Sequence, residues 1–192
     1  MKRAFFFDRD GILNQTLLEK NPNGAYNRWP INVDELILTP HAKSIVDRVN
    51  KLGYIPIVVT NQRGIYEGKM TLQDYENITN KLCLNLGLER AQIFECLHKN
   101  DGECACRKPK PGLFLMARGL YDLDLSTSWM IGDSCSDIEA AKNSGIENTI
   151  FLRIPTLDGI RIGNEKEENE IKKKGLNATY KINNLIELIY LI

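Results

Sequence analysis

The sequence predicts an α/β protein with a mainly parallel sheet, and three observations carry that prediction. Short apolar runs of strand-forming residues alternate along the chain with longer stretches of helical spacing. The 192 residues suffice for one domain with a sizeable core, and no repeat or low-complexity linker divides them. Strands separated by helices need crossover connections, which give a parallel sheet covered on both faces. We therefore expect a single domain over residues 1–192.

Most of the expected strands are short runs of mainly apolar residues. The first strand, Ala4–Phe7, ends where Asp8 begins a polar motif. The remaining strands are expected at Ile55–Val59, Gln92–Glu95, Ser128–Ile131, Thr149–Leu152 and Thr179–Ile182. Runs this short and this apolar are typical of strands that are buried on both faces of a sheet.

The expected helices are recognised by their apolar spacing and their caps. Leu72–Leu86 follows Thr71, whose hydroxyl can cap the helix together with Asp74, and Gly87 ends it. The other helices are expected at His41–Leu52, Gly112–Tyr121, Ser136–Ser144 and Asn184–Tyr190. A run of glutamates and lysines between residues 165 and 174 is typical of the solvent-exposed face of a further helix.

Composition and charge exclude several classes of function. Lys plus Arg and Asp plus Glu both number 25, so the formal net charge is zero, whereas a nucleic-acid-binding protein needs a basic excess or stripe. No apolar run is long enough to span a membrane. The N-terminal apolar run ends at Asp8, too early for a signal peptide. We expect a cytoplasmic monomer that acts on a small molecule, with neither nucleic acid nor membrane as a partner.

Four polar motifs should meet at one edge of the sheet. They are residues 8–11 (Asp-Arg-Asp-Gly), 60–62 (Thr-Asn-Gln), 107–109 (Arg-Lys-Pro) and 132–133 (Gly-Asp). Three of them directly follow expected strands, and in a parallel sheet the carboxyl ends of the strands form the edge where ligands bind. Alone, each motif is ordinary turn chemistry. Their order and placement together indicate a catalytic site.

The motifs contain the groups that phosphate-ester hydrolysis needs. Asp8 and Asp10 leave one strand two residues apart, so one can act as a nucleophile and the other as a general acid and base. Lys108 offers a positive charge for the phosphate and for the charge that develops in the transition state. The Thr60 hydroxyl and the Asn61 backbone N–H can hold the remaining phosphoryl oxygens.

The same carboxylates predict a magnesium site. A carboxylate and a phosphate repel each other, so the attack needs a cation between them. Mg²⁺ takes oxygen ligands, and Asp8, the backbone carbonyl of Asp10 and Asp133 can supply them. We therefore expect Mg²⁺ as a cofactor.

The cysteines predict a second metal site. Cys96 and His98 are followed by Cys104 and Cys106, and three thiolates with one imidazole can surround one Zn²⁺ tetrahedrally. The alternatives are buried unpaired thiols or a disulfide. The polar residues between the two pairs disfavour a buried core, and a cytoplasmic setting disfavours a disulfide. We expect a zinc-binding loop over residues 96–106.

The motifs together resemble those of the haloacid dehalogenase (HAD) superfamily, and most closely its branch of heptose-bisphosphate and histidinol-phosphate phosphatases. The match runs from Phe5 to about Leu152. The resemblance implies a HAD-like Rossmannoid three-layer sandwich without a large cap domain. It also implies a phosphoric monoester hydrolase in which Asp8 is phosphorylated while Asp10 protonates the leaving oxygen and later activates water. The further roles that it implies are phosphate or substrate binding by Thr60, Asn61, Arg107 and Lys108, and completion of the Mg²⁺ site by Asp133.

The branch carries a zinc loop directly before its Arg-Lys-Pro motif, so zinc is expected to stiffen the segment that presents Arg107 and Lys108. The expected substrate is a small sugar phosphate, with heptose 1,7-bisphosphate of lipopolysaccharide or capsule synthesis preferred. Histidinol phosphate is the alternative substrate, since the catalytic residues are shared. An alternative of another class is a non-catalytic, zinc-stapled binding module. Residues 14–30 form either a small flap over the site or a plain surface loop.

Overall fold

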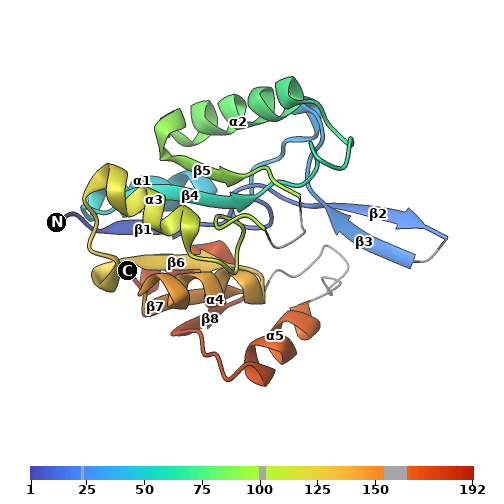
Figure 1. Ribbon diagram of the computed structural model, residues 1–192. Coiled ribbons are helices and arrows are strands. Elements are labelled where there is room, and N and C mark those ends of the chain that lie inside the picture. Colours follow the sequence, from blue (N-terminus) through green and yellow to red (C-terminus); the bar gives the residue numbers. More distant parts are fainter. Residues whose placement is uncertain (23, 100–102, 154–163) are drawn as a thin grey trace.

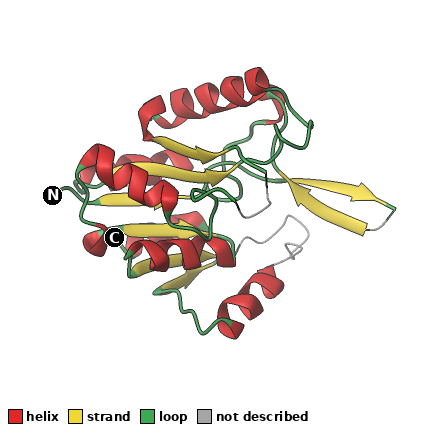
Figure 2. Ribbon diagram, viewed as in Figure 1, coloured by secondary structure: helices red, strands yellow, loops and turns green. Residues whose placement is uncertain are grey.

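The computed structural model describes residues 1–22, 24–99, 103–153 and 164–192 (Figures 1 and 2). Its centre is a six-stranded sheet in the order β5-β4-β1-β6-β7-β8. The strands are β1 (Ala4–Phe7), β4 (Ile55–Asn61), β5 (Ile93–Cys96), β6 (Trp129–Gly132), β7 (Asn148–Leu152) and β8 (Tyr180–Ile182). All neighbours in this sheet pair in parallel. The predicted parallel sheet is confirmed, with strand ends within about two residues of those expected.

Helices connect the strands. They are α1 (Ala42–Lys51), α2 (Leu72–Leu86), α3 (Gly112–Tyr121), α4 (Cys135–Ser144) and α5 (Asn164–Lys173), with 3₁₀ helices η1 (Val33–Glu35), η2 (Arg90–Gln92), η3 (Leu125–Thr127) and η4 (Leu185–Tyr190). The predicted capping box of α2 is present, because the Thr71 hydroxyl accepts a hydrogen bond from the Asp74 N–H at 3.0 Å. In the described part of the chain, no helix is both long and apolar enough to cross a bilayer.

Three expected helices differ from the structure in their details. α4 begins at Cys135, one residue before the expected Ser136. α1 begins after His41 instead of at it, since His41 has a φ of 69° and lies in the left-handed region, outside helical geometry. The last helix was expected over Asn184–Tyr190, and η4 is a 3₁₀ helix that starts one residue later, with Asn184 as its N-cap. The predicted helix in the charged run near residue 170 is present as α5.

The sheet lies between two layers of helices, so the predicted three-layer sandwich is confirmed. Along β1, Phe5 and Phe7 point to the face covered by α1, α2 and η4, whereas Ala4 and Phe6 point to the face covered by α3 and α4. This alternation follows from the period of two in a strand, and all four side chains are fully buried. α5 packs outside α4 and β7 through Ile171. The central strand β1 is therefore fixed on both faces.

The strand order also determines where a ligand can bind. The chain runs from β1 outward through β4 to β5, then returns to β6 on the other side of β1 and continues to β7 and β8. The order thus reverses beside β1. In open parallel sheets, such a reversal leaves a crevice outside the carboxyl ends of the strands, and that crevice is the usual ligand site.

Residues 14–30 contain a β-hairpin. β2 (Leu17–Asn21) and β3 (Gly24–Arg28) pair antiparallel in a sheet of their own. Figure 1 shows this hairpin projecting beyond the carboxyl ends of the parallel strands. Its base is anchored because the guanidinium of Arg28 makes two hydrogen bonds to the carboxylate of Glu35, at 2.6 and 2.8 Å. The segment is thus neither an irregular loop nor a domain-sized cap.

Candidate active site

Asp8 and Asp133 lie at the carboxyl ends of neighbouring strands. Asp8 directly follows β1 and Asp133 directly follows β6, and these two strands pair with each other. The Asp8 backbone N–H donates to the carbonyl of Ile131 at 3.0 Å, which extends the sheet by one bond and fixes the start of the loop. The predicted meeting of the first and last motifs at one sheet edge is confirmed.

Lys108 joins the third motif to these strands. Its ammonium Nζ lies 2.8 Å from Asp8 Oδ1, 2.5 Å from Asp137 Oδ1 and 2.8 Å from the carbonyl oxygen of Val59. The side chain is only 2% exposed. Burial alone lowers the pKa of the ammonium, but the Asp137 and Asp8 carboxylates outweigh it and raise the pKa above its ordinary value. Lys108 is therefore a permanent positive charge at the sheet edge.

Three carboxylates gather around this charge. Oxygens of Asp8, Asp133 and Asp137 lie within 4.8 Å of one another. Burial raises the pKa of Asp8 to about 8; the positive charge of Lys108 opposes that rise, and the carboxylates of Asp137 and Asp133 add to it. Three ionised carboxylates beside one ammonium carry a net negative charge that a divalent cation can balance, and Mg²⁺ prefers oxygen ligands. The donor set therefore fits the predicted metal.

Asp137 is held in this cluster by the start of α4. Its Oδ2 accepts hydrogen bonds from the Ser134 N–H at 3.1 Å and the Ser134 hydroxyl at 2.7 Å, which forms a capping box. A Cβ on Gly132 would lie 2.5 Å from Asp137 Cγ, so only glycine fits there. One carboxylate thus caps a helix and pairs with Lys108.

Asp10 is surrounded by hydrogen-bond donors. Its carboxylate accepts from Arg9 Nε and Nη2 at 3.2 Å each, from Asn14 Nδ2 at 2.9 Å and from Gln62 Nε2 at 2.5 Å. Arg9 is fully buried, with its guanidinium 5.6 Å from the centre of the Tyr75 ring. Sequence reasoning missed the parts that Arg9, Asn14 and Gln62 play. Arg9 and Gln62 lie inside the recognised motifs, and that position was the available signal.

Thr60 and Asn61 are brought to the same place. Thr60 is buried, and its Oγ1 accepts a hydrogen bond from Gln62 Nε2 at 2.8 Å. The side chain of Asn61 brackets the backbone of Lys108, since its Oδ1 accepts from the Lys108 N–H at 3.0 Å and its Nδ2 donates to the Lys108 carbonyl at 3.1 Å. Arg107 is half-buried, and its Nη1 has no hydrogen-bond partner among the described residues.

The four predicted zinc ligands also converge. Cys96 Sγ lies 3.6 Å from both His98 Nδ1 and Cys104 Sγ, and His98 Nδ1 lies 3.1 Å from Cys106 Sγ. Tetrahedral zinc with ordinary bond lengths places such ligand atoms about 3.5–3.8 Å apart, so two of the three separations match this spacing and the third is shorter. All four ligand atoms lie within 4.8 Å of one another. The side chains fit Zn²⁺, and Cys106 directly precedes Arg107.

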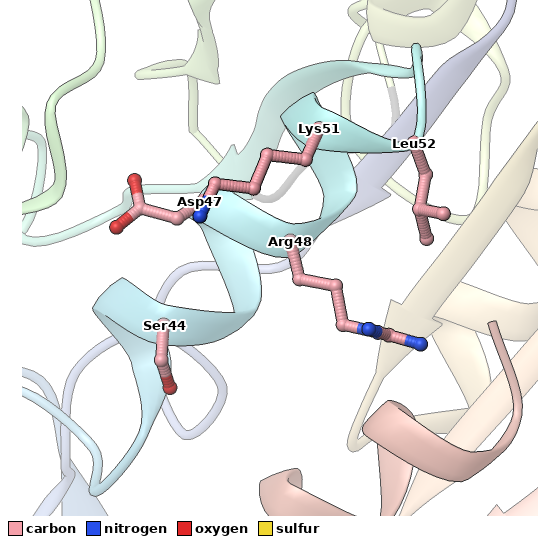
Figure 3. A pocket seen from close by; sticks show the side chains of 5 residues that line it. All are labelled: Ser44, Asp47, Arg48, Lys51 and Leu52. Atoms are coloured by element: carbon pink, nitrogen blue, oxygen red, sulfur yellow. The ribbon is translucent and has the colours of Figure 1, made fainter.

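A hollow of about 280 Å³ on α1 lies apart from these residues (Figure 3). It is lined by Ser44, Asp47, Arg48, Lys51 and Leu52. Arg48 extends toward the C-terminal segment, where its Nη2 donates to the carbonyl of Ile189 at 3.1 Å. None of the polar motifs contributes to this hollow, so the candidate active site is the sheet edge at Asp8.

Comparisons with known proteins point the same way. A family model described as HAD-hydrolase-like matches residues 105–153. A Helicobacter pylori protein named D-glycero-β-D-manno-heptose-1,7-bisphosphate 7-phosphatase is 37% identical over 154 residues, which cover 78% of this chain and 83% of that protein. A Photorhabdus laumondii protein named D-glycero-α-D-manno-heptose-1,7-bisphosphate 7-phosphatase is 30% identical, and the match covers 96% of this chain and 97% of that protein.

A solved structure agrees with these relatives. The D,D-heptose 1,7-bisphosphate phosphatase of B. bronchiseptica, crystallised with magnesium and phosphate, superposes with a TM-score of 0.76. It is 25% identical, and the match covers 99% of both chains.

Proposed function

This chain belongs to the HAD-type phosphatases named for heptose bisphosphate, and on that premise we propose that it hydrolyses the 7-phosphate of D-glycero-D-manno-heptose 1,7-bisphosphate. The observation that carries the proposal is the pairing of Lys108 with Asp8 at the carboxyl end of β1, 2.8 Å apart, in a chain whose relatives bear that name. Asp8 is the nucleophile and Asp10 the general acid and base.

The two aspartates divide the reaction between them. Asp8 attacks phosphorus while Asp10 protonates the ester oxygen, so the sugar leaves as an alcohol and Asp8 carries an aspartyl-phosphate. Asp10 then takes a proton from water, which attacks the phosphorus and releases inorganic phosphate and free Asp8. The hydrogen bonds from Arg9, Asn14 and Gln62 hold the Asp10 carboxylate in one orientation for both steps.

Positive charge and fixed dipoles hold the phosphate. Lys108 neutralises charge on the phosphoryl oxygens, and Asp137 and Asn61 fix its ammonium and its backbone. Thr60 and Arg107 bind the remaining oxygens. Asp8, the Asp10 carbonyl and Asp133 would hold Mg²⁺, with Asp137 beside them. When bound, Mg²⁺ supplies charge neutralisation between the carboxylate and the phosphate.

Cys96, His98, Cys104 and Cys106 would hold Zn²⁺ as a closed structural site with no part in the chemistry. Because Cys106 is separated from Lys108 by one residue, a metal held by these side chains would fix the segment that presents the lysine. We further propose that the protein works in the cytoplasm as a monomer.

The test is a panel of phosphate esters assayed with Mg²⁺ and purified protein. We expect heptose 1,7-bisphosphate to have the highest kcat/KM. The panel includes both its α and its β anomer, so that the two are compared directly. Asp8→Asn should lower kcat by about 10⁴-fold or more, since it removes the nucleophile. Asp47→Asn in the α1 hollow is the matched control and should leave the rate unchanged.

The outcomes separate the alternatives. A clear preference for histidinol phosphate would replace the proposed substrate. Turnover that persists in Asp8→Asn would refute the covalent route. A protein inactive on the whole panel would favour the non-catalytic binding module, although Asp8, Asp10 and Asp133 are all in place against that reading.

A further inference from the structure

The helix α5 lies at the edge of the molecule, beside α4 (Figure 1), and none of the four polar motifs belongs to it. It packs on α4 and β7 through Ile171, which is buried together with Cys135, Ile138 and Phe151. Cys135 is the first residue of α4. α5 therefore contacts the helix that begins two residues after Asp133.

Glu167 on α5 caps the first turn of α4. Its Oε2 accepts a hydrogen bond from the Cys135 N–H at 2.7 Å. The first N–H groups of a helix have no partner inside the helix, and a buried donor left without an acceptor is costly. The capping box of α4 satisfies two other groups, the N–H of Ser134 and the N–H of Asp137. Cys135 is 4% exposed, so its N–H depends on the carboxylate that α5 supplies.

The same turn carries two groups of the candidate active site. Asp137, two residues after Cys135, places its Oδ1 2.5 Å from the Nζ of Lys108. The side chains of Asp137 and Lys108 are 1% and 2% exposed, so water cannot replace this contact. Asp133, two residues before Cys135, belongs to the carboxylate cluster. Displacing the Cys135 backbone would therefore move both carboxylates relative to Lys108.

Other ion pairs hold α5 in place. Lys174 binds Glu139, a residue of α4 one turn beyond its start, at 2.7 Å. Glu168 binds Arg153, which follows β7, at 3.1 Å. Among these three polar contacts, only that of Glu167 ends on the first turn of α4. The other two can keep α5 docked when the Glu167 contact is removed.

We propose that Glu167 is a positioning residue for catalysis, which fixes the first turn of α4 so that Asp137 holds Lys108 in place. The inference rests on the proposed function, in which Lys108 neutralises charge on the phosphoryl oxygens. It makes α5 a support of the active site, although α5 contributes no group to the chemistry.

Steady-state kinetics on the preferred phosphate ester with Mg²⁺ tests the inference. Glu167→Ala leaves the Cys135 N–H without its acceptor and lets the turn shift, so kcat should fall about tenfold. KM should change less than about twofold, because the lost contact acts on the transition state through Lys108 and does not touch the substrate. Glu167→Gln keeps a carbonyl oxygen that can accept the same hydrogen bond, so it should retain more than about a third of the original kcat.

Glu168→Ala is the matched control. It removes the neighbouring carboxylate of α5 and its ion pair with Arg153. This weakens the docking of α5, as Glu167→Ala does, yet it should leave kcat unchanged. Equal kcat values in the two alanine variants, or equal losses in Glu167→Ala and Glu167→Gln, would overturn the inference.

Amide hydrogen exchange followed by NMR gives a readout that needs no substrate. The Cys135 N–H should exchange at least about tenfold faster in Glu167→Ala than in the unaltered protein, whereas Glu168→Ala should leave its rate unchanged. An unchanged Cys135 exchange rate in Glu167→Ala would also overturn the inference. An unaltered protein that protects the Cys135 amide but hydrolyses no phosphate ester would instead refute the proposed function, which is a different result.

Discussion

Replacing Asn61 by alanine isolates the link between β4 and the catalytic lysine. Asn61 makes two hydrogen bonds to the backbone of Lys108, at 3.0 and 3.1 Å, in a partly buried setting. Each such bond contributes about 1 kcal/mol net, so we expect Asn61→Ala to lower the free energy of unfolding by about 2 kcal/mol. In a chain of this size, that corresponds to a fall in Tm of about 4–8 °C.

The effect on catalysis should be larger than the effect on stability suggests. Without the two bonds, the Lys108 backbone can shift relative to Asp8, and a shift of about 1 Å in a catalytic group costs roughly a hundredfold in rate. The assay is kcat on the preferred phosphate ester at saturating Mg²⁺, at a temperature well below both melting points, beside Tm from thermal unfolding.

Asn143→Ala is the control for this experiment. Asn143 donates one hydrogen bond, at 3.0 Å, to the carbonyl of Pro109, the residue after Lys108. We expect it to cost at most about 1 kcal/mol and to leave kcat unchanged. An Asn61→Ala protein with lowered Tm and unchanged kcat would refute the reasoning, because the contacts of Lys108 with Asp8, Asp137 and Val59 would then suffice to place it.

Three further predictions concern the metals, the cluster and the assembly. Removing zinc, with a chelator or by Cys106→Ser, should lower Tm clearly and change kcat little. Removing Mg²⁺ should abolish turnover with little change in Tm. Equal losses of Tm after the two treatments would contradict this division of roles. Gly132→Ala should lower the free energy of unfolding by about 1–3 kcal/mol and should lower kcat, because the new methyl group displaces Asp137. Calorimetry measures the first effect, and an unchanged kcat would contradict the second. Sedimentation velocity should give a species near the chain mass of 21.9 kDa, and a dimer would correct the expected monomer.

Much of the fold was predictable because its strands are buried on both faces. Ala4–Phe7 is apolar at every position and is followed by the charged Asp8. The local sequence is therefore enough to predict both the strand and the position of Asp8 at its carboxyl end. The capping pair of Thr71 and Asp74 located α2 in the same way, since a cap depends only on residues three apart.

The hairpin was not predicted because its sequence shows no alternation of apolar and polar residues, and Leu17–Lys20 and Tyr26–Arg28 are all half-buried or exposed. Residues 17–21 and 24–28 mix apolar, charged and amide side chains. The Asn23–Gly24 pair between them is a recognised hairpin signal and was the available clue.

The surroundings of Asp10 escaped prediction for another reason. The contact with Gln62 joins residues 52 positions apart and exists only once β1 and β4 pair. Asn14 turns back onto Asp10 through a tight loop in which Gly11 has a φ of 93°, and local sequence does not encode that geometry uniquely. Motifs therefore locate catalytic groups more reliably than they reveal what orients them.

The separateness of the hairpin has an evolutionary consequence. In the part of the chain that the structure describes, β2 and β3 pair only with each other, and no strand of the six-stranded sheet depends on them for a hydrogen-bonding neighbour. Lengthening, shortening or reshaping the segment between Leu17 and Arg28 would thus leave the register of β1 and the position of Asp8 unchanged. Insertions, deletions and substitutions can therefore accumulate in this appendage without altering the catalytic residues.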